Sequence, residues 1–410
     1  MSSLAESLPP MDHGVRIDRL RSSLAALAAS GSGSADGPDA LLITHLTNLR
    51  YLSGFTGSAG LLLVLPDEVV FVSDGRYGAQ AERQLAGLDV RIEISGDRQR
   101  EIVSDAVRAA GVRALGFEGA TIGWDQHRTY ATNWFEGVEF VPTMSLVEQL
   151  RILKDDAEIE RIRLAAAIAD TALASLRPTL GDGPTEEEFG LALDTEMRRL
   201  GASGPSFETI VASGPNSAVP HHRPSSRRIA DGDLVVLDFG ALLDGYCSDM
   251  TRTVLVGDGT EAQRHQFDVV LAAQAAGVDR VMAGIGTSVV DEACREVIEA
   301  AGWGDRFTHG TGHGVGLDIH EAPRVGRTAG DTLAAGQVVT VEPGVYLTGV
   351  GGVRIEDSVV VTEDGCVPLT LTPKDPSIGL SWQPSPLQTS RTAPPSTSTR
   401  GSTRSSSSSM

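Results

Sequence analysis

The sequence predicts an α/β (α+β) protein of two domains, and three observations lead to that prediction. The chain has 410 residues, which fits two domains of roughly 100–200 residues each. Its first part alternates helical periodicity with short apolar runs, as in an α/β unit with a mixed sheet. Its second part is rich in β-branched runs that glycine-rich turns separate. We therefore expect domains at residues 15–150 and 151–380.

The first domain is predicted from one helical segment and six apolar runs. Ile17, Leu20 and Leu24 recur at helical spacing. Each short apolar run is bounded by turn residues and indicates a strand. The six runs lie at 41–44, 61–65, 69–73, 90–94, 114–118 and 140–143.

The second domain is expected to open with two helices. The first begins at Asp155–Asp156, and the second begins at Thr185. Thr185 and Glu188 have the spacing of a capping box, in which each side chain accepts a hydrogen bond from the other residue's backbone N–H. Strand-rich sequence follows from residue 205, with further helices expected near 261–283 and 288–301.

Both ends of the chain are expected to be disordered. Residues 1–14 contain two prolines and little periodicity. Residues 381–410 contain eleven serines, five threonines and no acidic residue. Such a segment cannot bury enough apolar surface to order itself.

Composition and charge exclude several classes of function. A formal net charge of −20 repels the phosphates of nucleic acids and anionic membranes. The apolar runs are far shorter than the ~20 residues of a membrane helix, and the first residues lack a signal-peptide pattern. The three cysteines include no CxxC pair, which favours a reducing compartment. We expect a cytoplasmic protein that binds neither nucleic acid nor membrane.

Two acidic residues flank a predicted hairpin turn. Asp238 ends the apolar run LVVLDFG, and Asp249 lies in YCSDMTRTV. With the turn centred on Leu243 and Asp244, the two acids would lie directly opposite each other, with Cβ atoms about 5 Å apart. Carboxylates that close repel strongly unless one is protonated or a cation lies between them. Two solvated acids near a hairpin are the alternative, which the apolar flanks disfavour.

A second hairpin repeats the arrangement. Glu342 in VVTVEPGVY and Glu356 in GGVRIEDSVVV are symmetric about Gly349, and TGVGG supplies the turn. This symmetry predicts that the two glutamates also lie opposite each other. Two such hairpins indicate an internal pseudo-repeat around one acidic site.

Three histidines fall in the glycine-rich stretch THGTGHGVGLDIHE, namely His309, His313 and His320. Four carboxylates with an imidazole form an oxygen-rich donor set for two divalent ions. Mn²⁺ is our first choice, with Co²⁺, Fe²⁺ or Zn²⁺ as alternatives. Two such ions activate water and polarise a carbonyl, so the expected reaction is hydrolysis.

These motifs together resemble a known family. The stretches that match it are NLRYLSGFTGSAG (48–60), FETIVASGPNSAVPHHRP (207–224), SDMTRT (248–253), HGTGHGVGLDIHEAPR (309–324), EPGVY (342–346) and GGVRIED (351–357). The chain resembles the pita-bread metallopeptidases of family M24, in the branch of Xaa-Pro aminopeptidases and Xaa-Pro dipeptidases (prolidases). The resemblance implies a creatinase/prolidase-like N-terminal domain, a pita-bread catalytic domain with an internal pseudo-repeat, and a homodimer.

The resemblance also implies a metal-ligand set. Asp238 would bind one metal, and Asp249 and Glu356 would bridge both metals. His313 and Glu342 would complete the second metal's ligands. Glu342 would also carry a proton from water to the leaving amine.

Further roles are implied around that set. His221, with its neighbour His222 as the alternative, would contact the substrate near the scissile bond. His320 would steady the tetrahedral intermediate, and Arg324 would suit a substrate carboxylate. His309 and Arg354 would support the metal ligands, although an ion pair of purely structural purpose is an equal alternative for Arg354.

The function expected is hydrolysis of the Xaa-Pro bond of proline-containing peptides, with release of the N-terminal residue. A dipeptidase that accepts only Xaa-Pro dipeptides is the alternative, which Arg324 favours. More remote alternatives on the same fold are a creatinase-like amidinohydrolase and a non-catalytic binding protein. Both normally lack several of the five ligands, all of which are present in this sequence.

Overall fold

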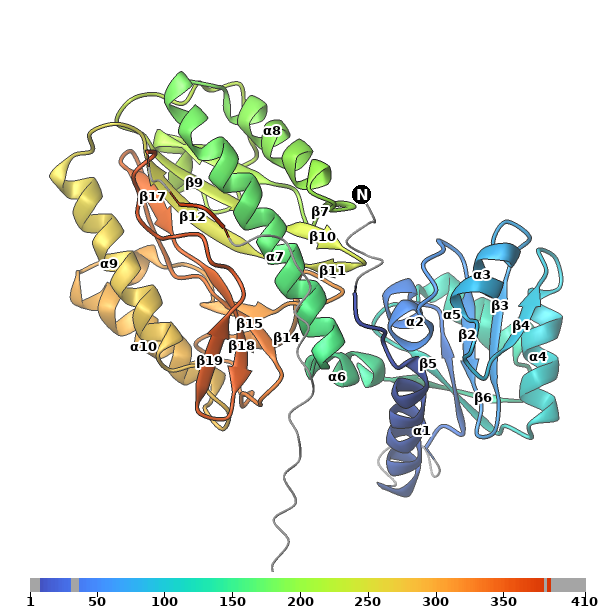
Figure 1. Cartoon of the computed structure of the whole chain (residues 1–410). Helices are drawn as coiled ribbons and strands as arrows, with labels where there is room; N and C mark the ends of the chain where they lie inside the picture. The colour runs from blue at the N-terminus through green and yellow to red at the C-terminus, as the bar shows by residue number, and fades with distance from the viewer. Residues whose placement is uncertain (1–7, 31–36, 380–381, 385–410) are drawn as a thin grey trace, which may run out of the picture.

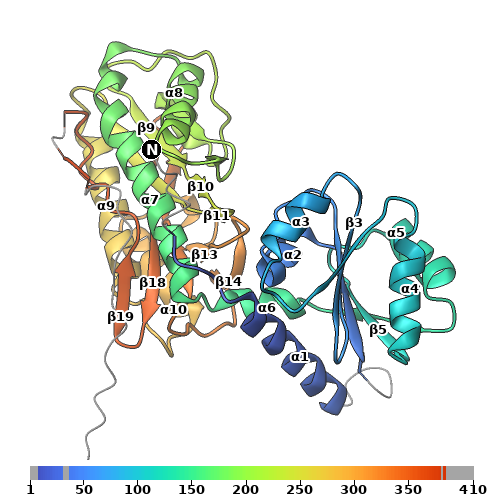
Figure 2. The same cartoon turned by 45° about the vertical axis from the view of Figure 1, so that its right-hand side comes forward.

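The computed structural model describes residues 8–30, 37–379 and 382–384 (Figure 1). An N-terminal part, built on one six-stranded sheet, lies beside a larger part that contains several small sheets. Helix α6 (Leu146–Ile152) lies where the two parts meet (Figure 2). The boundary that we propose at residues 150–151 falls in this helix. The tail expected at 381–410, except residues 382–384, lies outside the described residues.

The N-terminal sheet contains the six strands that the apolar runs predict. These are β1 (Ala40–Ile43), β2 (Leu61–Val64), β3 (Val69–Ser73), β4 (Arg91–Ile94), β5 (Ala114–Glu118) and β6 (Glu139–Thr143). Their order in the sheet is β4-β3-β2-β1-β5-β6. The pairs β1–β2 and β2–β3 are antiparallel and the others are parallel. The prediction of a mixed sheet is therefore confirmed.

Helices cover both faces of this sheet, which is why its inner strands are apolar without alternation. The helical elements are α1 (His13–Ser30), α2 (Leu46–Ser53), α3 (Gly78–Gln84), α4 (Gln99–Ala109), α5 (Trp124–Thr129) and the π-helical turn η2 (Tyr130–Trp134). On β1, Leu41 and Ile43 pack with α1, α2 and α3, while Leu42 points to the α4 side.

The first residues described differ from the disorder expected for 1–14. Helix α1 begins at His13. Arg161 Nη1 donates a hydrogen bond to the carbonyl of Pro9 at 2.9 Å. Met11 packs against a cluster that includes Tyr246. These contacts come from the second part of the chain, so a local reading of residues 8–14 could not predict them.

The larger part repeats one order of elements. In its first half two helices precede short strands: α7 (Asp156–Leu176), η3 (Arg177–Asp182), α8 (Glu186–Arg199), β7 (Gly204–Pro205), β8 (Ile210–Ser213), η4 (Gly214–Ala218), β9 (Leu234–Phe239), β10 (Ala241–Leu243), β11 (Tyr246–Cys247) and β12 (Met250–Leu255). Both predicted helix starts are confirmed, because Asp155 and Thr185 each form a capping box.

The second half has the same order. Its elements are α9 (Glu261–Val278), α10 (Thr287–Ala300), η5 (Gly304–Arg306), β13 (Gly312–Gly314), β14 (Glu321–Val325), β15 (Val338–Val341), β16 (Gly344–Leu347), β17 (Gly351–Arg354), β18 (Asp357–Thr362) and β19 (Gly365–Pro368). Helix α9 ends earlier than expected, because the backbone N–H groups of Ala283 and Gly284 donate to Thr362 and Leu333 instead. The repeated order fits the expected pseudo-repeat.

Each half has its own core. One buried cluster joins α7 and α8 to β9 and β12, and another joins α9 and α10 to β15 and β18. The strands that carry the candidate site therefore lie between two helix pairs. Within the described part of the chain, no helix has the length and apolarity needed to cross a membrane.

Candidate metal centre

The first hairpin brings its acids together in a different register from the one predicted. Asp238 pairs with Thr251, so Asp249 is two residues away from the opposite position. The turn is centred on Asp244 and Gly245, which both have positive φ, at 45° and 79°. A two-residue turn of the I′ type requires positive φ at both central positions. The prediction was wrong by one turn residue, although both acids stay at the same end of the hairpin.

The second hairpin has the register that the sequence predicts. Glu342 and Glu356 occupy opposite positions, between two ladder pairs. Those pairs are Val341–Asp357 and Gly344–Arg354. The backbone N–H of Glu342 donates to Thr311, and that of Glu356 donates to Thr251, so both glutamates are anchored. The Thr251 hydroxyl also donates to Glu356 Oε2 at 2.7 Å.

His313 on β13 joins the two hairpins. Its Nδ1 lies 2.9 Å from the carbonyl oxygen of Gly314, which only accepts, so Nδ1 carries the proton of this contact. Nε2 of the neutral ring then has a free lone pair. That atom lies 3.6 Å from Asp249 Oδ2 and 3.4 Å from Glu342 Oε1. A lone pair that faces two carboxylates is repelled unless a proton or a metal ion lies between them.

The donor atoms of Asp249, His313 and Glu356 all lie within 4.8 Å of one another. Two buried carboxylate oxygens, Asp238 Oδ1 and Glu356 Oε1, have no hydrogen-bond partner. Buried carboxylate oxygens without partners are costly unless a cation binds them. The residues present therefore fit divalent metal ions held by oxygen and imidazole donors.

The electrostatics of these residues point to the same conclusion. Burial, followed by repulsion from neighbouring carboxylates, raises the pKa of Asp249 and of Glu356. Burial raises the pKa of Glu342 to about 8. Burial also lowers the pKa of His313 to about 4, which keeps its ring neutral. A bound metal ion would compensate this concentration of negative charge.

Arg354 and Tyr346 form a buried connection next to the acids. Arg354 Nη2 donates to Asp238 Oδ2 at 2.6 Å, and its Nη1 donates to the Tyr346 hydroxyl at 2.8 Å. The Tyr346 oxygen lies 2.9 Å from His309 Nε2. His309 Nδ1 faces a carbonyl and carries the proton, so the Tyr346 hydroxyl donates to Nε2. Tyr346 lies in the motif EPGVY, but the sequence alone predicts no role for it.

His221 and His222 are distinguished by Glu186 on α8. The buried Glu186 carboxylate accepts hydrogen bonds from Ser213, Asn216 and Ser225, and it lies 2.9 Å from His222 Nε2. These bonds lower the pKa of Glu186 to about 2 despite its burial. His222 thus contacts the same carboxylate that holds residues 213–225, while the neighbouring His221 is exposed. Burial lowers the pKa of His309 to about 4 and also lowers that of His320, and nearby His221 adds a smaller effect in the same direction.

His320 and Arg324 lie at the open side of the group. The His320 ring is exposed and packs edge-on against His313, with 4.4 Å between the ring centres. Arg324 on β14 pairs with His313 in the ladder, and its side chain is exposed. These contacts bring Asp238, Asp249, His313, Glu342 and Glu356 together with His309, His320 and Arg354. Arg324 lies beside His313 in the ladder, and His221 lies on the loop after η4.

Two family models match the chain. The model of metallopeptidase family M24 matches residues 160–363. The model of the creatinase/prolidase N-terminal domain matches residues 16–153.

Individual proteins match over nearly their whole length. An uncharacterized peptidase of Bacillus subtilis is 42% identical over 339 residues, which cover 83% of this chain and 95% of the relative. The solved Xaa-Pro dipeptidase from Bacillus anthracis is 38% identical with a TM-score of 0.83, covering 89% of this chain and 99% of that one. The X-Pro aminopeptidase structure from Thermotoga maritima is 34% identical with a TM-score of 0.78, covering 82% and 97%.

Proposed function

The chain belongs to metallopeptidase family M24, and on that premise we propose that it is an Xaa-Pro aminopeptidase. It would hydrolyse the bond before proline and release the N-terminal residue of peptides with proline in second place. The expected two-domain fold, a creatinase/prolidase N-terminal domain with a pita-bread catalytic domain, is confirmed. Relatives named as aminopeptidase and as dipeptidase both have this fold.

The observation that carries the proposal is the contact of His313 Nε2 with Asp249 and Glu342, inside a buried group of carboxylates. We assign Asp238, Asp249, His313, Glu342 and Glu356 as ligands of two divalent metal ions. Such ions, when bound, would lower the pKa of a water molecule and polarise the scissile carbonyl.

The remaining residues would act on the peptide itself. Glu342 would take the proton of the attacking water on a carboxylate oxygen and pass it to the proline nitrogen. This transfer is needed because an amide nitrogen leaves only as a protonated amine, so the proton lost by the water ends as the N–H of the released proline. The exposed imidazoles of His221 and His320 would donate hydrogen bonds to the peptide carbonyl as negative charge develops there.

The metal, the assembly and the compartment belong to the same proposal. Mn²⁺ is the ion we propose first, because the donor set has four carboxylates and one imidazole. A homodimer in a reducing cytoplasm is also proposed, and the three cysteines, all within the described residues, are free thiols. Metal analysis of the purified protein and light scattering in solution test the first two points.

A dipeptidase is the second candidate, because Arg324 is exposed beside His313. Its guanidinium is suited to a carboxylate, and in an Xaa-Pro dipeptide the proline carboxylate is the chain end. A longer peptide has no carboxylate at this place.

One digest separates the candidates. The purified protein is incubated with Mn²⁺, with and without EDTA, on Ala-Pro and on a longer Xaa-Pro-Xaa peptide, and products are measured by mass spectrometry. Release of the first residue from the longer peptide, abolished by EDTA, supports the aminopeptidase. Cleavage of Ala-Pro alone supports the dipeptidase. No cleavage of either by metal-loaded protein would reject Xaa-Pro peptides and leave a creatinase-like amide substrate or a binding role.

A further inference from the structure

We propose that Arg151 on α6 is a positioning residue, through which the N-terminal part of the chain holds His320 in the site. Arg151 would act on the segment Gly316–Glu321, called here the His320 segment. The inference rests on the proposed function, in which His320 contacts the substrate.

The His320 segment lacks regular secondary structure up to His320, and its last residue, Glu321, begins β14. It joins β13 to β14 as a series of bends. Its backbone is tied to the surrounding protein at its two ends, where the N–H of Cys247 donates to the Gly316 carbonyl at 2.8 Å and where Glu321 pairs with Gly314 on β13. Leu317 packs against buried clusters of both parts of the chain. The position of His320 therefore depends strongly on side-chain contacts.

Arg151 supplies two of these contacts from a buried position. Its side chain is 3% exposed. Nη2 donates to Asp318 Oδ2 at 2.6 Å and to Glu321 Oε1 at 2.5 Å. Lys154 Nζ donates to the other oxygen of Glu321 at 2.9 Å. Both carboxylates that flank His320 in the chain are thus bound from α6 and the residues just after it.

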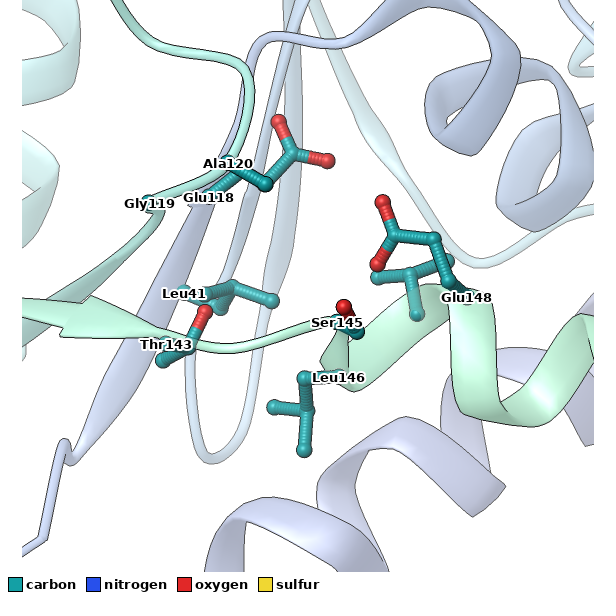
Figure 3. Close-up of a pocket in the computed structure, with 9 residues that line it drawn as sticks. Leu41, Glu118, Gly119, Ala120, Thr143, Ser145, Leu146 and Glu148 are labelled. Carbon is teal, nitrogen blue, oxygen red and sulfur yellow. The ribbon is translucent and has the colours of Figure 1, made fainter. Parts of the chain in front are cut away.

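Arg151 is itself oriented by Asn48 on α2. The Asn48 Nδ2 group donates to Glu118 Oε1 and Glu148 Oε1, at 2.7 Å each. Figure 3 shows these two glutamates extending toward each other from β5 and α6. Because carboxylates only accept, the amide nitrogen must face them, and the amide oxygen is left to accept from Arg151 Nη1 at 2.8 Å. The connection therefore runs from β5 to the His320 segment without a gap.

Glu118, Glu148 and His45 could also be considered as a metal site, because their donor atoms lie within 4.8 Å of one another. The Glu118 carboxylate, however, already accepts from the backbone N–H groups of Thr44 and His45 and from Asn48. The adjoining cavity, lined by both glutamates, has a volume of about 10 Å³ and holds at most one water molecule. We therefore assign this group to orienting Asn48.

Arg151→Met tests the proposal, and Arg16→Met is the matched control. Arg16 is also a buried arginine that joins the two parts, through Asp155 at 2.7 Å and Glu158 at 3.2 Å, but it does not contact the His320 segment. We expect Arg151→Met to lower kcat/KM on an Xaa-Pro peptide by about 10-fold or more, mainly through kcat, with metal content unchanged. Arg16→Met should keep kcat/KM within about 2-fold, even if it unfolds at a lower temperature.

A double-mutant cycle with His320→Ala distinguishes positioning from general damage. If Arg151 acts through His320, adding Arg151→Met to His320→Ala should cost less than about 2-fold. The same loss in both backgrounds, or no loss in either, would overturn the proposal. If Arg151→Met does not fold, Asp318→Asn removes one of the two ion pairs and takes its place in the cycle.

Hydrogen exchange of the full-length, metal-loaded protein gives a readout independent of catalysis. Arg151→Met should speed exchange in residues 316–321, and Arg16→Met should not. If the wild type cleaves no Xaa-Pro peptide but this difference is seen, the proposed function fails and the positioning role stands. If the wild type is active and exchange in 316–321 is unchanged by Arg151→Met, the positioning role fails alone.

Discussion

His313 Nε2, which carries a lone pair, lies 3.4 Å from Glu342 Oε1. The other ring nitrogen donates to a backbone carbonyl, and burial lowers the pKa of His313 to about 4. Burial also raises the pKa of Glu342 to about 8. The carboxylates around His313 are therefore the most informative positions to change.

Asp249→Asn should release bound metal and abolish activity. Asp249 is 4% exposed and contributes one of the three donor atoms that lie within 4.8 Å of one another. Changing a residue that hydrogen-bonds to a metal ligand typically lowers metal affinity or activity 10–100-fold. Changing a ligand itself should therefore lower activity at least about 100-fold. Metal per chain after dialysis and peptide cleavage measure the two effects. The exposed Asp268→Asn on α9 is the control, and full metal content in Asp249→Asn would contradict the assignment.

Tyr346→Phe should lower kcat by about 10–100-fold while metal content stays near that of the wild type. The change removes the hydroxyl that accepts from Arg354 and donates to His309, so both side chains lose a buried partner. Steady-state kinetics with metal analysis provide the measurement. Tyr130→Phe, which loses a hydroxyl bonded to Gln126 in the N-terminal part, should leave kcat unchanged.

Glu186→Gln should reduce stability in a pH-dependent way. Hydrogen bonding lowers the pKa of Glu186 to about 2, so its stabilising effect is complete above the ordinary pKa near 4.5 and is lost as pH falls toward 2. The difference in unfolding free energy between wild type and variant should shrink by about 3 kcal/mol between pH 5 and pH 2. Urea unfolding at a series of pH values measures it.

The exposed neighbour Glu187 supplies the control for that experiment. Glu187→Gln should change the unfolding free energy by less than about 0.5 kcal/mol at every pH. If the difference in unfolding free energy between wild type and Glu186→Gln is independent of pH, the carboxylate charge is not what holds the loop that carries His221.

Arg324→Met should separate dipeptides from longer peptides. If the guanidinium binds the proline carboxylate, its loss should raise KM for Ala-Pro by about 10-fold or more, since a charged hydrogen bond contributes about 1.5–3 kcal/mol. KM for a longer peptide should change little. Arg327→Met, which alters an exposed arginine paired with Glu299, is the matched control. Equal effects on both substrates would argue against carboxylate binding.

The local sequence pattern was sufficient to predict the six N-terminal strands, two helix starts and the register of one of the two acidic hairpins. The six N-terminal strands and the capping boxes at Asp155 and Thr185 follow from periodicity and from side chains three residues apart. The pairing of Glu342 with Glu356 follows from a turn symmetric about Gly349. In the other hairpin, Asp244 in positive φ moved the turn by one residue, so Asp238 faces Thr251 rather than Asp249.

Motif resemblance named ten candidate site residues, but only the tertiary structure decided which side chains hold them in place. Tyr346 links Arg354 to His309, Glu186 binds the loop of His221, and Arg151 reaches Glu321 across 170 positions of sequence. A repeating pattern of 2 or 3.6 residues records which face of an element is buried. It does not record which distant side chain meets that face, because that is settled by how the two parts of the chain pack.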